Sequence, residues 1–271
     1  MKKTTTITCL SILAATAAQA DQPIMNMMPR WDGGWGYQLI QEYRHESALK
    51  LGNQEIRSGL TENAHITHLE GVYTWDRSIR LTVKVPYVLE ANRSVIDDMS
   101  NVVRQKDSGL GDITVALPLK KYFNLDGRSG SWTLAPQVRI PTNSKDDFDI
   151  YDRAWGAGLY AGYETETSTW FFGIGAGAWL FEGDEEEEVS VHMDVGWNFE
   201  VGEMNGQLLW ETDFKYESDG THVLKAGPAF YWRFNDTTHM RIEWKHDFVD
   251  YQGTVDHGNG NTFKIGVGFV F

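Results

Sequence analysis

The last ten residues, 262–271 (TFKIGVGFVF), alternate between two kinds of side chain. Phe263, Ile265, Val267, Phe269 and Phe271 are aromatic or aliphatic, whereas the positions between them up to 268 carry Thr, Lys or Gly. Because successive side chains of a β-strand point to opposite faces, the pattern predicts a strand with one apolar face and one small or charged face. A strand of a soluble sandwich can show the same alternation, so the rest of the chain must show what the apolar face meets.

The N-terminus has the features of a secretory signal peptide. Lys2 and Lys3 precede an apolar stretch over 7–18, and Ala18-Gln19-Ala20 forms a small-x-small cleavage site. The apolar stretch is too short to span a bilayer, and no later stretch approaches the roughly 20 apolar residues of a membrane helix. We therefore expect a signal peptide at 1–20, a short periplasmic leader at 21–31 with three methionines and no assigned function, and one folded domain at 32–271.

Cysteine and charge exclude several classes of protein. Cys9 is the single cysteine and lies in the signal peptide, so the mature chain is expected to hold no disulfide and no thiolate metal site. The formal net charge is -14, and cleavage of the signal peptide removes two lysines and no acid. A surface this acidic argues against nucleic acid as a partner. No cofactor is expected.

Two segments show the strand pattern most clearly. In 78–91, Ile79, Leu81, Val83, Val85, Tyr87, Leu89 and Ala91 share a face opposite Arg80, Thr82, Lys84, Pro86 and Glu90. In 189–201, Val189, Val191, Met193, Val195, Trp197, Phe199 and Val201 oppose Ser190, His192, Asp194, Asn198 and Glu200. Charges of both signs at alternate positions require water or paired charge on that face, and the other face requires a medium as apolar as lipid.

Weaker versions of the pattern complete a set of twelve segments. They are 33–47, 63–76, 78–91, 110–123, 132–141, 153–164, 169–181, 189–201, 206–217, 222–234, 238–250 and 262–271. The odd-numbered connections, 48–62, 92–109, 142–152, 182–188, 218–221 and 251–261, are mostly long and polar, and the others are mostly tight turns. Long outer loops, short inner turns and an even strand number predict an all-β fold, a transmembrane antiparallel up-and-down β-barrel of about twelve strands.

Aromatic residues fall at both ends of these segments, where the membrane meets water. The lower rim is predicted to carry Trp35, Trp75, Phe123, Trp132, Tyr163, Trp170, Phe199, Phe234 and Phe271, and the upper rim Tyr43, Tyr87, Trp155, Tyr216 and Phe248. A soluble sandwich or jelly roll gives no reason for two such bands. Pro86, Pro118, Pro136 and Pro228 lie inside predicted strands, so bulges or strand ends are expected there, and Lys121 is expected to point outward near the lower interface.

Two stretches resemble known families. The final strand, with its apolar alternation and terminal Phe271, resembles the closing strand of bacterial outer-membrane barrels, which implies an outer-membrane location and recognition by the barrel-assembly machinery. The stretch 108–143, with GLGD at 109–112, VALPL at 115–119, KYF at 121–123 and WTLAPQVRIPTN at 132–143, resembles the outer-membrane proteins associated with the meta-cleavage pathway of phenol degradation. That family ends the second strand in Pro-Thr-Gly, and this chain has Asn143 in place of the glycine. The resemblance implies a channel or transporter for small, including aromatic, compounds.

The expected function is a passive outer-membrane channel or diffusion facilitator for small solutes. Its lumen is predicted to be lined by cations at Arg80, Lys84, Arg139, Lys215, Lys225, Arg233, Arg241, Lys245 and Lys264 and by acids at Glu42, Glu70, Asp112, Asp194, Glu200, Glu211, Asp213, Glu243 and Asp247. Twelve strands predict a narrow bore. One alternative is a structural or adhesive barrel whose lumen is closed by salt bridges, which single-channel conductance would distinguish.

The second alternative is an esterase. Ser190, His192 and Asp194 share the lumen face, but neighbours two residues apart on a strand are separated by roughly 6.5 Å, too far for a Ser-His-Asp relay. His45-Glu46-Ser47 resembles the His-x-Ser pair of outer-membrane phospholipase A, although Ala48 and Leu49 stand where that family has Asn-Gly. The interpretation favoured for these groups is lumen polarity, and the chain is not expected to be an enzyme.

Acidic runs occupy two outer loops. Asp146, Asp147, Asp149 and Asp152 lie in the third loop, and Asp184 with Glu185 to Glu188 lies in the fourth. The first lacks the glycine and later glutamate of a calcium loop, and a solvated loop is favoured over cation bridging to lipopolysaccharide for both. Lipid and lipopolysaccharide remain the expected partners of the apolar outer face.

Overall fold

The regular structure of the described chain is β-strand throughout. The computed structural model describes residues 33–96, 101–125, 127–142, 150–151, 153–183, 185–202 and 204–271. The strands are β1 (Gly34–Gly52), β2 (Gln54–Asp76), β3 (Ile79–Ile96), β4 (Val102–Leu110), β5 (Ile113–Ala116), β6 (Leu119–Leu125), β7 (Arg128–Ile140), β8 (Gly156–Glu166), β9 (Trp170–Phe181), β10 (Glu188–Val201), β11 (Met204–Glu217), β12 (His222–Arg233), β13 (Thr238–Gly258) and β14 (Asn261–Val270). No helix among these residues is long and apolar enough to cross a membrane.

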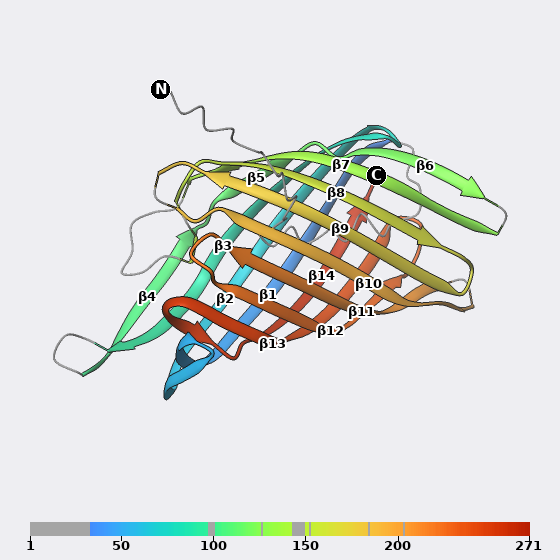
Figure 1. Cartoon of the computed structure of the whole chain (residues 1–271). Helices are drawn as coiled ribbons and strands as arrows, with labels where there is room; N and C mark the ends of the chain where they lie inside the picture. The colour runs from blue at the N-terminus through green and yellow to red at the C-terminus, as the bar shows by residue number, and fades with distance from the viewer. Residues whose placement is uncertain are drawn as a thin grey trace, which may run out of the picture.

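The strands form one antiparallel sheet that closes on itself (Figure 1). Sequence neighbours pair from β1 to β4 and from β6 to β14, β5 pairs with β3 and β7, and β14 pairs with β1 in an unbroken register from Gly36 opposite Val270 to His45 opposite Asn261. The Phe271 backbone N–H then donates to the Trp35 carbonyl at 2.8 Å, which continues this seam to the end of the strand. The closing role expected for 262–271 is confirmed.

The fourteen strands make twelve passages across the barrel wall. β4, β5 and β6 follow one another between β3 and β7 as one interrupted passage, in which β5 and β6 correspond to the segment predicted at 110–123 and β4 extends it into the expected connection 92–109. The interruptions lie at Gly111-Asp112 and at Leu117-Pro118. The twelve-stranded barrel expected from the alternation is therefore confirmed.

The prolines lie where the strand pairing is interrupted. Pro86 faces the break between β4 and β5, where its carbonyl accepts a hydrogen bond from the Gly111 N–H at 2.9 Å. Pro118 is in the second break, and Pro136 of β7 lies opposite it. Pro228 lies in the gap of the β12–β13 register between Ala226 and Ala229. At such breaks no carbonyl of a neighbouring strand depends on the N–H that proline lacks.

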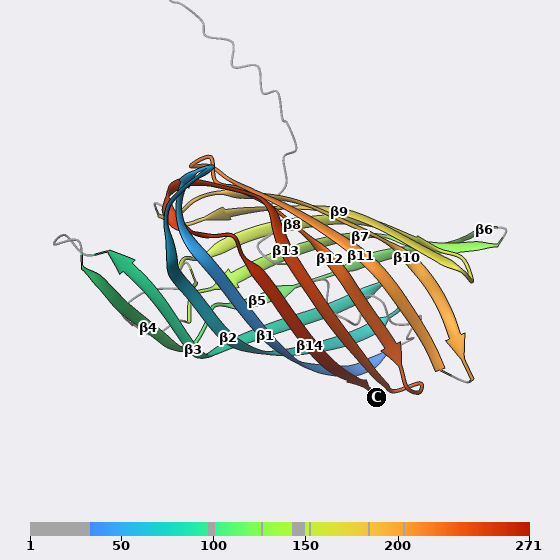
Figure 2. The ribbon, with the colours of Figure 1, turned by 90° about the horizontal axis from the view of Figure 1, so that it is seen from below.

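Three outer connections are more regular than the sequence indicates. The sequence predicts loops at 48–62, 92–109 and 251–261, but β1 and β2 run to a tight turn at 53, β3 and β4 pair beyond residue 91, and β13 continues to Gly258. These extensions carry polar residues on both faces, so they give no alternation signal although their backbones pair. Figure 2 shows the β3–β4 hairpin projecting from the end of the barrel opposite the C-terminus.

The predicted face assignment fails at one bulge in β3. Leu89 is an extra residue between the pairs Ile66–Val88 and His65–Glu90. An extra residue reverses the alternation, so Ala91 is buried and Glu90 is exposed, opposite to the prediction.

The outward faces form an apolar belt between aromatic bands. Leu39, Leu69, Val195 and Ile265 are among the exposed apolar residues at mid-wall. Exposed aromatic residues stand at one end (Trp35, Trp75, Trp132, Trp170, Phe234, Phe271) and at the other (Tyr43, Tyr87, Trp155, Tyr216, Phe248). An apolar belt on the outside of a closed barrel is the lipid-facing surface of an outer-membrane protein.

Some expectations fall outside the described residues. They are the signal peptide 1–20, the leader 21–31 with its methionines, the acidic residues Asp146, Asp147, Asp149 and Asp152 of the third outer loop, and Asp184 of the fourth.

Val195→Arg tests the assignment of faces. Val195 is exposed in the middle of β10, so we expect the arginine to destabilise the barrel in lipid by roughly 2–4 kcal/mol, measured by urea titration of heat-modifiable protein in vesicles. The isosteric Asp194→Asn changes the inward neighbour and should reduce the stability of the barrel by less. Equal losses in the two variants would contradict the assignment.

Candidate functional site

The inner face of the barrel encloses a cavity of about 440 Å³. Side chains from most of the strands line it, including Arg44 of β1, Lys84 of β3, Tyr160 of β8 and Lys245 of β13. These residues reach the lumen because alternate positions of each strand point inward once the sheet is closed. Charged residues are the most numerous group in the lining, and Tyr151, Tyr160 and Trp179 add aromatic surface.

One wall of this cavity carries a network of alternating charges centred on Lys245. The Lys245 ammonium lies 3.0 Å from a Glu211 oxygen, 3.0 Å from a Glu243 oxygen and 2.5 Å from an Asp213 oxygen. Arg241 donates to Glu211 and, at 3.0 Å, to Glu243. Each carboxylate on this wall therefore faces at least one cation.

The network continues in both directions around the barrel. On one side, Lys264 of β14 lies 3.7 Å from Glu243 and 3.8 Å from Glu42 of β1, which also contacts His68 of β2 at 2.8 Å. On the other side, the two ring nitrogens of His192 contact Asp213 at 2.5 Å and Asp194 at 2.7 Å. The charged wall thus extends from β10 to β2.

Removal of a central cation of this network has a large cost. Glu211 is fully buried, and Glu243 and Lys245 are nearly so. A buried charge that loses its partner costs several kcal/mol, because the low dielectric strengthens its interaction with the remaining like charges and desolvation is not repaid. The wall is therefore fixed in place by mutual pairing of its charges.

The opposite wall has fewer charges and more aromatic surface. Lys84 lies 3.8 Å from Glu70, Lys120 lies 3.0 Å from Glu164, and Arg139 lies 3.9 Å from Glu188. The Arg139 guanidinium also stacks over the rings of Trp179 and Phe181, at 5.0 and 4.6 Å from their centroids. The two rings are themselves stacked at 6.0 Å.

Inward glycines on β8 and β9 hold these aromatic rings flat against the wall. A Cβ added to Gly158 would lie 2.6 Å from the Trp179 ring, and one added to Gly156 would lie 2.7 Å from Phe181. A Cβ at Gly175 would lie 2.0 Å from the Tyr160 hydroxyl. Because the glycines leave this space, the rings occupy less of the lumen.

Part of the third outer connection folds back against the inner wall. Ile150 and Tyr151 pack against the buried cluster of Ala64, Ile66, Val88 and Ala91. The Tyr151 ring covers Gly111, where an added Cβ would lie 2.3 Å away, and burial raises the pKa of the Tyr151 hydroxyl above its ordinary range.

Aspartates of the interrupted passage between β4 and β5 hold this returning segment. Asp107 accepts a hydrogen bond from the Ile150 N–H at 3.4 Å, and Asp112 accepts from the N–H groups of Arg153 and Thr142 at 3.1 and 3.3 Å. Asp112 of the GLGD stretch and Asp107 just before it therefore supply the acceptors that hold Ile150 and Tyr151 beside the cavity.

The eighteen charged residues expected to line the lumen all lie on the inner face. Eleven border the main cavity (Glu70, Lys84, Asp112, Arg139, Asp213, Lys215, Lys225, Arg241, Glu243, Lys245, Lys264), Glu200 and Arg233 border a second pocket, and Glu42, Arg80, Asp194, Glu211 and Asp247 are buried in the wall. Sequence reasoning missed Tyr151, Tyr160, Trp179 and Phe181. The repeated inward glycines at 156, 158, 173 and 175 were the available signal for the last three.

The two hydrolase-like clusters have different surroundings from those of a catalytic relay. His192 is held between two aspartates. His45 contacts the Asn63 side chain at 2.7 Å, whereas the Ser47 hydroxyl donates to the Asn259 carbonyl at 3.4 Å. No group of three or more potential metal ligands was found among the described residues.

Comparisons with known proteins agree with this geometry. A family model described as "Putative MetA-pathway of phenol degradation" matches residues 43–265. An outer-membrane channel from Pseudomonas putida F1 superposes with a TM-score of 0.68 at 14% identity, over 90% of this chain and 97% of that chain. The NanC porin superposes with a TM-score of 0.51 at 11% identity, over 87% and 100%. At these identities the likeness concerns the fold. No match was found among curated proteins.

Gly158→Val tests whether the glycines accommodate the aromatic wall. We expect a loss of roughly 1–3 kcal/mol, because the Trp179 ring must leave its place, measured by urea titration in vesicles. Gly71→Val is the control for the same substitution on the outer face, since a Cβ there meets nothing closer than 4.0 Å. A Gly158 variant as stable as the control would show that the ring position does not depend on this glycine.

Proposed function

This chain belongs to the phenol-degradation family whose model matches residues 43–265, and from that premise we propose that it is a passive outer-membrane channel for small solutes. Aromatic compounds are the solute class that the family description suggests. The observation that carries the proposal is the cavity of about 440 Å³ inside a closed barrel, lined by charged and aromatic side chains from most of the strands. A barrel serving only as a scaffold has no need of such a lining.

The charged lining suggests how the channel would select among solutes. Lys225, Arg241, Glu243, Lys245 and Lys264 border the cavity, where water screens charges less than at an open surface. Arg80, Lys84, Arg139, Asp194, Glu211, Asp213, Arg233 and Asp247 complete the proposed set of pore residues. Because cations and acids alternate, the field along the lumen changes sign over short distances, which disfavours highly charged solutes relative to small neutral ones.

A closed structural barrel is the second candidate. The observation in its favour is that the charge network is tightly paired and that Ile150 and Tyr151 cover part of the inner wall. Single-channel conductance in planar bilayers separates the two proposals, since a closed barrel gives no conductance steps. The geometry also favours a protein without enzymatic activity, because His45 and Ser47 bond to different partners. An assay with a serine-reactive phosphonate tests the esterase alternative.

Replacement of both Arg241 and Lys245 by Gln tests the role of the charged wall. The double variant leaves Glu211, Glu243 and Asp213 without their main cations, so the reversal potential under a salt gradient should shift toward cation selectivity. The shift should shrink as ionic strength rises. Lys121→Gln is the control, because Lys121 is exposed on the outer face. Unchanged selectivity in a conducting double variant would remove these residues from the pathway.

We also propose that lipid and lipopolysaccharide contact the apolar belt and that the barrel-assembly machinery recognises β14 together with Phe271. Phe271 is exposed at the end of the closing seam, its N–H bonds to Trp35, and its ring lies 6.3 Å from that of Tyr37. These contacts place an accessible aromatic group beside the two strands that close the barrel.

Phe271→Ala tests this recognition. The amount of heat-modifiable protein in outer-membrane fractions should fall several-fold, because the variant lacks the exposed ring at the seam. Phe234→Ala is the matched control, since Phe234 is also exposed at this end of the barrel but lies in the β12–β13 turn. Equal assembly of the two variants would argue for another recognition route.

A further inference from the structure

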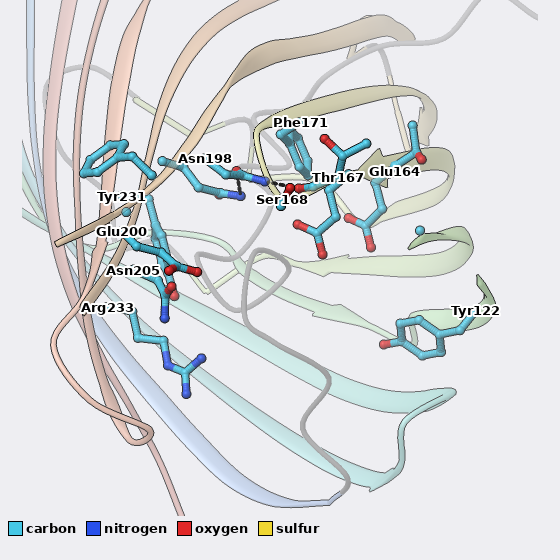
Figure 3. Close-up of a pocket in the computed structure, with 16 residues that line it drawn as sticks. Tyr122, Glu164, Thr167, Ser168, Phe171, Asn198, Glu200, Asn205, Tyr231 and Arg233 are labelled. Carbon is cyan, nitrogen blue, oxygen red and sulfur yellow. Dashed lines mark hydrogen bonds between the residues drawn. The ribbon is translucent and has the colours of Figure 1, made fainter. Parts of the chain in front are cut away.

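A second pocket, of about 330 Å³, lies at the end of the barrel that carries the short turns (Figure 3). It is bordered by the turn between β8 and β9, by the ends of β10, β11 and β12, and by Tyr122 of β6. Tyr122 lies across the opening from Asn205 and Arg233 in Figure 3. This pocket and the charged cavity described above share no lining residue.

A chain of hydrogen bonds fixes how Gln207 faces this pocket. The Asn198 side-chain nitrogen donates to the backbone carbonyls of Thr167 and Trp170, at 2.8 and 3.4 Å. The Asn198 oxygen is therefore turned toward Gln207, whose nitrogen donates to it at 2.8 Å. This leaves the Gln207 Oε1 as an acceptor that has no hydrogen-bond partner among the described residues, on a side chain that is only 9% exposed.

Tyr231 presents a second polar group beside it. Gln207 and Tyr231 are direct cross-strand partners of β11 and β12, and both point inward. The Tyr231 side chain is 4% exposed, and its hydroxyl also has no partner in the described part of the chain. Directly opposed side chains start about 5 Å apart at Cβ, so the two residues belong to the same part of the pocket wall. A ligand hydroxyl that reaches both oxygens could donate to Gln207 and accept from Tyr231.

The rest of the lining combines apolar, neutral polar and charged groups, and the carboxylates of Glu166 and Glu200 belong to it. Phe171 forms a buried cluster with Leu209 and Ala229 and borders the pocket. The Glu164 carboxylate is paired with Lys120 at 3.0 Å, and Arg233 is paired with Asp236. A charged ligand would have to compete with these pairs, whereas a neutral ligand would not.

We propose that this pocket is a binding subsite for a neutral organic solute that carries a hydroxyl group and an apolar face. The hydroxyl bridges Gln207 and Tyr231, and the apolar face rests against Phe171. The inference rests on the proposed channel function, because it assigns the subsite to solutes that pass the turn end of the barrel. The observation behind the proposal is that two buried polar atoms without a partner among the described residues lie on directly opposed inward positions of a pocket wall.

The test uses the full barrel in lauryldimethylamine oxide, a detergent without hydroxyl groups. The probe is 4-fluorobenzyl alcohol, followed by its ¹⁹F chemical shift during titration, with protein-free micelles as the baseline. We expect saturable binding that Gln207→Leu and Tyr231→Phe each weaken about 2- to 10-fold, the effect of losing one hydrogen bond. Tyr231→Phe removes a single oxygen atom and therefore keeps the test valid where Gln207→Leu disturbs folding.

Matched probes and a control variant separate the outcomes. 4-Fluorobenzyl methyl ether keeps the ring but cannot donate, and 4-fluorobenzoate is an anion, so both should bind more weakly than the alcohol. Tyr216→Phe makes the same chemical change at an exposed, outward position and should leave the affinity unchanged. Equal affinities for alcohol and ether, or for wild type and Tyr231→Phe, would overturn the proposal and assign the two oxygens to water.

Conductance measured on the same preparations distinguishes this inference from the function on which it rests. Conductance steps in planar bilayers, without saturable binding of the alcohol, would contradict the subsite and support the channel. Saturable binding that is sensitive to both variants, in a barrel without conductance steps, would support the subsite and contradict passage through the lumen.

Discussion

The structure depends on the hydrogen bonds that join β14 to β1. A strand in lipid has no water to satisfy its backbone groups, so a sheet with an open edge is excluded there and only closure is stable. The ten pairs from Gly36–Val270 to His45–Asn261 provide that closure. Once the sheet is closed, each side chain in the wall faces either lipid or the lumen. The apolar belt and the charged interior are therefore two consequences of the same seam.

The sequence predicts the wall of the barrel well, because two-residue periodicity is a local property. Residues 189–201 alternate without interruption, and the structure gives them the predicted faces. The pattern fails where a tertiary feature intervenes. Leu89 is indistinguishable from its neighbours in sequence, yet its bulge reverses the faces of Glu90 and Ala91. The paired extensions of β1, β2 and β13 have polar residues on both sides, so their regularity leaves no trace in hydropathy.

The interior was predictable in kind but not in detail. Charges such as Lys245 and Glu211 could be assigned to the lumen, but they come from β13 and β11, with β12 between them, so their contact depends on the stagger of three strands. The aromatic wall requires a second kind of information. Trp179 lies flat only because Gly158 is its direct partner on the neighbouring strand, and that pairing is a property of the register.

The two pockets differ in how their polar groups are satisfied. In the central cavity, Lys245, Glu243 and Glu211 neutralise one another, so a passing ion meets groups that already have partners and gains little by displacing them. At the turn end, Asn198 holds Gln207 so that an acceptor remains available beside Tyr231. A neutral hydroxyl compound gains hydrogen bonds there without breaking an ion pair. The preference of the lumen for neutral solutes would then depend on which polar groups already have a partner and which do not. The net charge of the lining would matter less.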